Sequence, residues 1–323
     1  MSDRWSRALR VLLGVGVLAL VVFTIDPVQA AGLLARANLL LVLLGVAGLT
    51  AVHLVAASAW RSLLAILAGI RLPWTRAIAT FYAAQAIGGV TPANVGGDLH
   101  RAVALRSAGL SWTASVAPLI VQRATSYVAL GALSVVAMVV LASSSALAMP
   151  LVGIGLLTAV VVGLGAWLVL VPPPPLAGAG AWLMRRLGGT PGVELGRVSG
   201  VGRATTLGLG SGVAFHALSV GLTFLLILAI DPLIPTVPVL AAITVARLSL
   251  AVPITPSGLG VQEGVLAVLF GSVGLSPGTA VAGLLLGRLA LVLTTGIGVW
   301  LLFRSDRGPV VVEGGVGQLP VAH

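Results

Sequence analysis

Apolar residues in this chain occur in long runs separated by short polar segments. A helix needs about 20 apolar residues to cross the hydrocarbon core of a bilayer. The pattern predicts six full transmembrane helices, over residues 11–25, 39–60, 113–141, 151–171, 205–230 and 279–303. Because the runs are continuous and do not alternate over ten-residue segments, helices are favoured over a membrane β-barrel.

Two further apolar segments are too short to span and contain Pro/Gly breaks. At about 1.5 Å per residue, residues 77–90 extend only about 21 Å, against about 30 Å for the hydrocarbon core. The first break, 91–97, is followed by 99–108, and the second break, 253–260, interrupts 237–270. We expect two re-entrant helical hairpins, with an ordinary kinked helix as the alternative. The predicted hinge residues are Pro92, Gly96, Gly97, Pro256, Gly258 and Gly260.

The two broken units resemble each other at a constant shift of 165 residues. Residues 98–131 and 263–296 are identical at 11 of 34 positions, about three times the chance expectation for this composition. Three predicted crossings separate the units, so the second copy enters from the opposite face. The sequence therefore predicts an inverted repeat, with units at about 77–141 and 237–303, which is an arrangement that transporters use.

Composition agrees with a single membrane domain over residues 1–303, followed by a tail, 304–323, that we expect to be disordered. Hydrophobic residues make up 58% of the chain and charged residues only 8%, against about 25% charged in soluble domains. The chain lacks cysteine and lysine. This excludes disulfides, thiolate metal sites, a Walker-A ATP site and a lysine Schiff base.

The net charge of +10 is interpreted as a topology signal, not as a sign of nucleic-acid binding. With six spans and two hairpins, outside loops hold only Arg36, and the first hairpin adds Arg101 and Arg106 to the inner side. The inner loops and termini hold Arg4, Arg7, Arg10, Arg61, Arg71, Arg76, Arg185, Arg186, Arg197, Arg203, Arg304 and Arg307. We therefore expect a multi-pass protein of the inner or plasma membrane with both termini in the cytoplasm.

Arg123 and Arg288 lie inside predicted spans at equivalent positions of the two units. A guanidinium near the bilayer centre costs about 2.5–3.5 kcal/mol on insertion scales and needs a counter-charge. Asp98 and Glu263 lie 25 residues upstream of the two arginines and are the predicted partners. The arginines could bind phosphate as bidentate forks, or each pair could be a structural salt bridge, and the two roles are compatible.

Three more residues are candidates for substrate contact. Arg247 precedes the second break and has no charged counterpart in the first unit; the alternative is a snorkelling side chain. Arg101 could meet lipid headgroups or serve only as a topology signal. Gln262 is polar within an apolar segment, where helix–helix hydrogen bonding is the alternative. The histidines show no metal-ligand spacing, so we expect no metal and no other cofactor.

Two stretches carry a resemblance to a known family. Residues 91–101 with Gln122 and Arg123, and residues 253–263 with Gly274 and Arg288, are similar to the two signatures of the flippase-like membrane family. That family includes the transmembrane region of lysylphosphatidylglycerol synthases. The resemblance covers about residues 10–303 and implies a protein that moves a phospholipid or polyprenyl-linked lipid between leaflets. At the positions where family members usually carry acidic residues near the first arginine, this chain has Gln122 and Tyr127.

The leading hypothesis is a lipid translocator whose intramembrane arginines hold the headgroup. One alternative is a non-catalytic scaffold that presents lipid to a separate transferase. Another is an ion-coupled transporter for a small anion. We expect no enzymatic activity, since no Ser/His/Asp or His/Glu constellation stands out and no transferase domain follows residue 303.

Overall fold

A computed structural model describes residues 32, 35–89, 91, 94–144, 153, 155–157, 159–160, 163–164, 200–251, 257–258 and 260–304. The regular elements within these ranges are all helical. They are α3 (Leu39–Ala68), α4 (Trp74–Gly88), α5 (Val95–Arg106), α6 (Trp112–Ser144), α9 (Val201–Leu228), α10 (Thr236–Ala246), the 3₁₀ helix η2 (Arg247–Ala251), α11 (Val261–Ser272) and α12 (Pro277–Arg304). The predicted span 11–25, most of the span 151–171 and the tail 305–323 lie outside the described residues.

Four of the described helices are long and apolar enough to cross a membrane. These helices, α3, α6, α9 and α12, coincide with the predicted spans 39–60, 113–141, 205–230 and 279–303. The fold is therefore that of a polytopic helical membrane protein. α3 continues eight residues past its predicted end at residue 60. The charged side chain of Arg61 is accommodated within the helix by two contacts. The Arg61 Nε donates to the Leu72 carbonyl at 2.7 Å and its guanidinium lies over the Trp74 ring.

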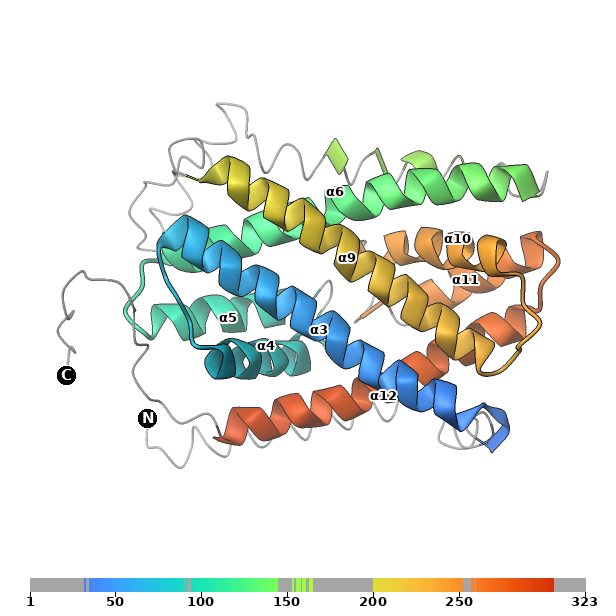
Figure 1. Cartoon of the computed structure of the whole chain (residues 1–323), viewed down its shortest axis with the longest axis horizontal. Coiled ribbons are helices and arrows are strands. Elements are labelled where there is room, and N and C mark those ends of the chain that lie inside the picture. Colours follow the sequence, from blue (N-terminus) through green and yellow to red (C-terminus); the bar gives the residue numbers. More distant parts are fainter. Residues whose placement is uncertain are drawn as a thin grey trace.

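The other helices form two short pairs, each interrupted at a break. α4 and α5 contain 15 and 12 residues, and α10 and α11 contain 11 and 12, all fewer than the roughly 20 that a span requires. In Figure 1 the α4–α5 pair lies beside one half of the long helices and the α10–α11 pair beside the other half. The interrupted ends of both pairs point towards the middle of the bundle.

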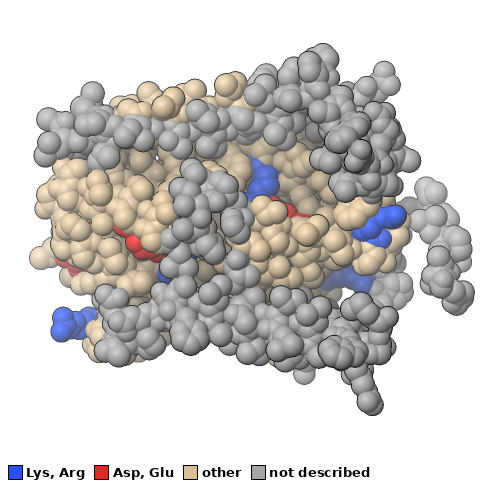
Figure 2. Space-filling view, turned by 180° about the vertical axis from the view of Figure 1, so that it is seen from behind, with Lys and Arg blue, Asp and Glu red and all other residues tan. Residues whose placement is uncertain are grey.

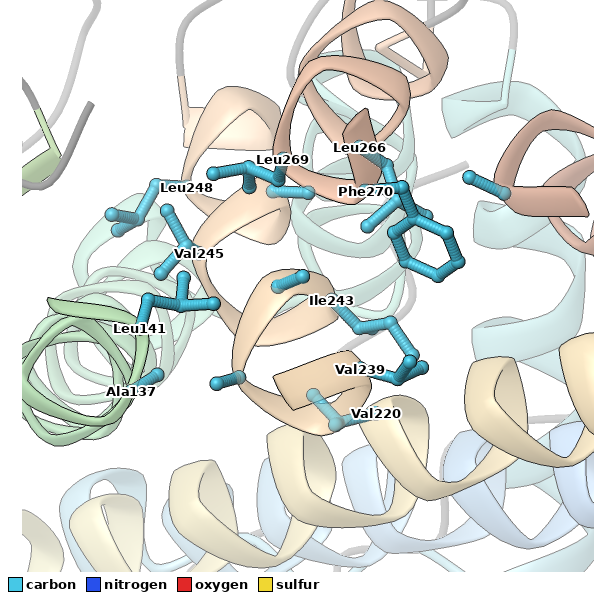
Figure 3. Close-up of a cluster of buried hydrophobic side chains, with 14 of the residues drawn as sticks. Ala137, Leu141, Val220, Val239, Ile243, Val245, Leu248, Leu266, Leu269 and Phe270 are labelled. Atoms are coloured by element: carbon cyan, nitrogen blue, oxygen red, sulfur yellow. The ribbon is translucent and has the colours of Figure 1, made fainter. Parts of the chain in front are cut away.

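A buried apolar cluster joins the second short pair to the long helices (Figure 3). Ile243 of α10, Leu248 of η2 and Phe270 of α11 pack there with Leu141 of α6 and Val220 of α9. Burying a large apolar side chain contributes about 1.5–3 kcal/mol. A second cluster, around Trp60, Leu64, Ala77, Ala102, Leu105 and Leu119, joins α4 and α5 to α3 and α6.

The outer surface is largely apolar. In α3, Leu39, Leu40, Leu43 and Leu44 are 50–65% exposed. In the view of Figure 2, charged side chains of the described residues interrupt an otherwise uncharged face at only a few places. Such a surface is expected of helices that face lipid, because lipid tails are as apolar as leucine.

Candidate functional site

The first charged cluster lies where α5 begins, beside the middle of α6. Asp98, in the first turn of α5, accepts from two arginines. The Arg123 Nε donates to the Asp98 Oδ2 at 2.7 Å, and the Arg101 Nη2 donates to the Asp98 Oδ1. The Arg123 Nη2 also reaches the carbonyl oxygen of Asn94 at 3.4 Å. The predicted counter-charge of Arg123 is therefore present.

Arg101 does not lie on the basic surface where the sequence analysis counted it. The residue is only 5% exposed. Its Nη1 donates to the Gln122 Oε1 at 3.0 Å, and its guanidinium lies over the rings of Trp60 at 5.4 Å and Phe81 at 5.3 Å. Arg101 is thus a buried residue whose partners come from α3, α4 and α6, and its place in the charge distribution across the membrane stays a prediction.

The second charged cluster lies at the start of α11. The Arg288 Nε and Nη2 donate to the Glu263 Oε1 at 3.0 and 2.8 Å, and the Arg288 Nη1 donates to the Ser257 carbonyl oxygen at 2.9 Å. The Glu263 Oε2 accepts from the Gly260 amide at 2.8 Å, which caps α11. Glu263 therefore fixes both the helix start and the arginine of α12, as predicted for this pair.

The two clusters share one geometry. Asn94 and Ser257 are the only non-glycine residues with positive φ in the described part of the chain, at 58° and 49°. Neither residue lies within a helix. The carbonyl oxygen of Asn94 accepts from Arg123, and that of Ser257 accepts from Arg288. In both units the arginine thus binds one carboxylate and one left-handed residue of the break.

The matched loops after the short helices also agree. Gly109 and Gly274, which correspond at the shift of 165 residues, have positive φ of 93° and 76°. The amide of Leu110 bonds to the Leu105 carbonyl, and that of Leu275 bonds to the Phe270 carbonyl, at equivalent positions. The sequence similarity therefore corresponds to repeated local structure.

The breaks of the two units are in direct contact. The Ser257 Oγ donates to the Gly89 carbonyl oxygen at 2.7 Å. Gly89 directly follows α4 and Ser257 precedes α11. This bond satisfies the Gly89 carbonyl oxygen, a backbone group at the end of α4, as a lipid environment requires.

The predicted hinge residues divide into three groups. Gly258 and Gly260 have φ of 68° and 77°, which glycine adopts without strain. Gly96 and Gly97 instead lie inside the first turn of α5, so their assignment to the break was wrong. They are needed because a Cβ on Gly96 would lie 2.7 Å from the Thr91 side chain, and one on Gly97 would lie 2.8 Å from the Asn94 Oδ1. Pro92 and Pro256 lie outside the described residues.

The two clusters differ in charge and access. The first pairs two arginines with one carboxylate, whereas the second pairs one arginine with one carboxylate. The side chains of Arg123 and Asp98 are 31% and 22% exposed, against 11% for both Arg288 and Glu263. The first cluster is therefore the more open and carries one excess positive charge.

Two further candidate residues take no part in these ion pairs. Arg247 is the first residue of η2, and its Nε is buried without a hydrogen-bond partner. Gln262 is 7% exposed in the first turn of α11. A polar chain links the Asn94 Nδ2 to the Gln85 Oε1 at 3.1 Å, and Gln85 to His53 at 3.3 Å.

Asn94 could have been found from its own pattern. Asparagine tolerates the left-handed conformation better than other non-glycine residues, and Asn94 directly precedes the start of α5. Trp60 and Phe81 gave no comparable signal, because an aromatic residue in an apolar helix is ordinary.

Comparison with known proteins agrees with this geometry. The chain matches the family model described as the lysylphosphatidylglycerol synthase TM region over residues 7–298. A search of curated proteins found no match. The match includes both charged clusters, both breaks, α3, α6 and α9, and α12 as far as residue 298. This chain therefore belongs to the lysylphosphatidylglycerol synthase transmembrane-region family, as the resemblance implied, and is a multi-pass membrane protein.

Proposed function

We propose that this protein moves a phosphate-bearing lipid, either a phospholipid or a polyprenyl-linked lipid, between the leaflets of the plasma membrane. The observation that carries the proposal is the contact between the two breaks, at Ser257 and Gly89, flanked by one arginine–carboxylate cluster on each side. Membership of a family named for a lipid synthase supports a lipid as the substrate. In this proposal the substrate crosses without chemical change.

The first cluster is the proposed entry point for the headgroup. Arg123 is the most accessible of the paired arginines, and Asp98 must neutralise both Arg123 and Arg101. An incoming phosphate can take the place of Asp98 on Arg123, because a guanidinium binds phosphate and carboxylate through the same fork of N–H groups. Arg101 then keeps Asp98 charged and in place.

The second cluster is the proposed counterpart on the other side of the contact. Arg288 and Glu263 repeat the arrangement of Arg123 and Asp98, with both side chains more enclosed. In an inverted repeat the two units exchange roles as the site opens to one face and then to the other. A state open on the α4–α5 side would expose the Arg123 and Asp98 side chains more than those of Arg288 and Glu263, and their exposed fractions differ in this direction.

The proposal is tested with purified protein in liposomes and a phospholipid carrying a headgroup label. The wild-type protein is expected to accelerate transfer of the label between leaflets. Arg123→Gln should slow transfer about tenfold or more, since a hydrogen bond to a charged group contributes about 1.5–3 kcal/mol. Arg203→Gln, at an exposed position near the start of α9, is the control and should transfer normally.

Two results would overturn the proposal. If the wild-type protein does not accelerate lipid transfer, the chain is not a translocator on its own, as a scaffold for a separate transferase would behave. If Arg123→Gln folds and transfers lipid at the wild-type rate, the headgroup does not depend on this arginine.

A further inference from the structure

We propose that Arg247 is the centre of a binding site for a phosphate-type oxyanion, where η2 packs against α6. This site differs from the two arginine–carboxylate clusters, because Arg247 has no carboxylate partner. The inference goes beyond the proposed function, since an anion could occupy Arg247 whether or not a lipid crosses the membrane.

The backbone of Arg247 is fixed by hydrogen bonds at the end of α10. It follows α10 directly, and its amide donates to the carbonyl oxygens of Ile243 and Val245. The neighbouring Leu248 and Val245 are buried in the large apolar cluster. The Nε of Arg247 is buried and makes no hydrogen bond. Among the described residues, Arg247 forms no ion pair with any carboxylate.

No acid among the described residues pairs with Arg247. Asp98 and Glu263 are already paired with other arginines. Asp231 lies in the turn after α9, where it accepts from the Leu233 amide. The predicted spans 11–25 and 151–171 and the break segment 252–256 contain no Asp or Glu. A bound anion would supply the counter-charge that Arg247 lacks within the described part of the chain.

An unpaired guanidinium at this depth is costly. Arginine does not lose its proton in proteins, and placing it near the bilayer centre costs about 2.5–3.5 kcal/mol. Arg247 is partly exposed as a residue, and its Nε is the atom that is buried without a partner. A bound anion would remove most of this cost and satisfy the free N–H.

His216 does not supply a second donor for an anion. It lies near the middle of α9 and is 5% exposed. Its Nε2 donates to the Ser126 carbonyl oxygen at 3.1 Å and lies 3.0 Å from the Ser126 Oγ of α6, while its Nδ1 is buried without a partner. In the neutral ring Nδ1 is then an acceptor, so the N–H donors for an anion come from Arg247.

A phosphate group fits this guanidinium better than a spherical anion does. The planar guanidinium offers paired N–H donors that match two phosphate oxygens. Both a phosphodiester of a lipid and free inorganic phosphate have this chemistry. The experiment therefore has one arm for each source.

The test measures thermal unfolding of delipidated protein in dodecyl maltoside, a detergent without phosphate. Inorganic phosphate is titrated in one arm and phosphatidylglycerol in the other. Ligand that binds only the folded state raises the unfolding midpoint, and we expect a rise of about 3 °C or more at saturation in at least one arm. Both arms use protein that carries Arg123→Gln, so that a headgroup bound at Arg123 does not contribute. In that background Arg247→Gln should abolish the rise, whereas Arg203→Gln should retain it.

Each outcome decides the proposal. A rise with inorganic phosphate that Arg247→Gln abolishes supports a site for the free anion, and a rise with phosphatidylglycerol alone supports a lipid phosphate. No rise in either arm, or an equal rise in Arg247→Gln, overturns it. If that variant does not fold, Arg247→Lys is used, and its binding should weaken about tenfold because an ammonium lacks the paired donors; unchanged binding contradicts the proposal. Lipid transfer is scored separately, so the proposed function and this site can fail independently.

Discussion

The hydroxyl of Ser257 donates a 2.7 Å hydrogen bond to the carbonyl oxygen of Gly89, across 168 residues of chain. This contact joins the interruption after α4 to the interruption before α11. On either side of it, an arginine from a long helix pairs with an acid at the start of a short helix. Polar groups from two stretches that lie far apart in the sequence are thus brought together within an otherwise apolar bundle.

Removing the carboxylates should affect the two clusters unequally. Asp98→Asn leaves both Arg101 and Arg123 without a counter-charge, whereas Glu263→Gln leaves only Arg288 unpaired. Breaking a buried pair costs about 3–5 kcal/mol, and we expect Asp98→Asn to be the more destabilising. Thermal unfolding in detergent measures the order. Equal losses, or a larger loss for Glu263→Gln, would contradict the shared role of Asp98.

Gly97 should be intolerant of alanine although it lies in a helix. An added Cβ would be 2.8 Å from the Asn94 Oδ1 and also against the Ala84 carbonyl, so α4 and α5 would have to separate. Gly97→Ala is expected to lower the unfolding midpoint. Gly264→Ala is the matched control, because Gly264 is helical in α11 and has open space around its Cβ position. That substitution should be neutral or stabilising by about 0.5–1 kcal/mol.

The turns at Gly109 and Gly274 should respond alike if the local structure is repeated. Both glycines have positive φ, which costs other L-residues about 1–2 kcal/mol. Gly109→Ala and Gly274→Ala should therefore destabilise the protein by similar amounts. Gly202→Ala, in the first turn of α9 with no atom near its Cβ position, should not. A loss in only one of the two turns would argue against equivalent loops.

The sequence permits some of these features to be predicted and hides others. The pairs Asp98–Arg123 and Glu263–Arg288 could be predicted, because buried arginines demand a counter-charge and each acid stands at the same separation. The long helices could be predicted from the length of their apolar runs. α5, however, begins at Val95, four residues before the predicted start at 99, because Gly96 and Gly97 permit close helix packing in place of a turn.

The environment of Arg101 and the contact between the breaks required the folded structure. Arg101 lies three residues from Asp98 in sequence, but its aromatic neighbours Trp60 and Phe81 belong to α3 and α4. The Ser257–Gly89 bond involves a backbone oxygen, which carries no residue-specific signal. Long-range contacts of this kind depend on how the helices pack and not on a local pattern.

A crosslink between the two breaks tests the central claim most directly. The chain has no cysteine, so Gly89→Cys with Ser257→Cys introduces a single pair. We expect a short bis-methanethiosulfonate reagent to link the two positions within one molecule, the linked protein to transfer labelled lipid much more slowly, and reduction to restore transfer. Ala129→Cys with Gly212→Cys, between α6 and α9, controls for crosslinking elsewhere. Failure of the first pair to crosslink while the control pair does, or undiminished lipid transfer by the linked protein, would contradict a translocation path where the two breaks meet.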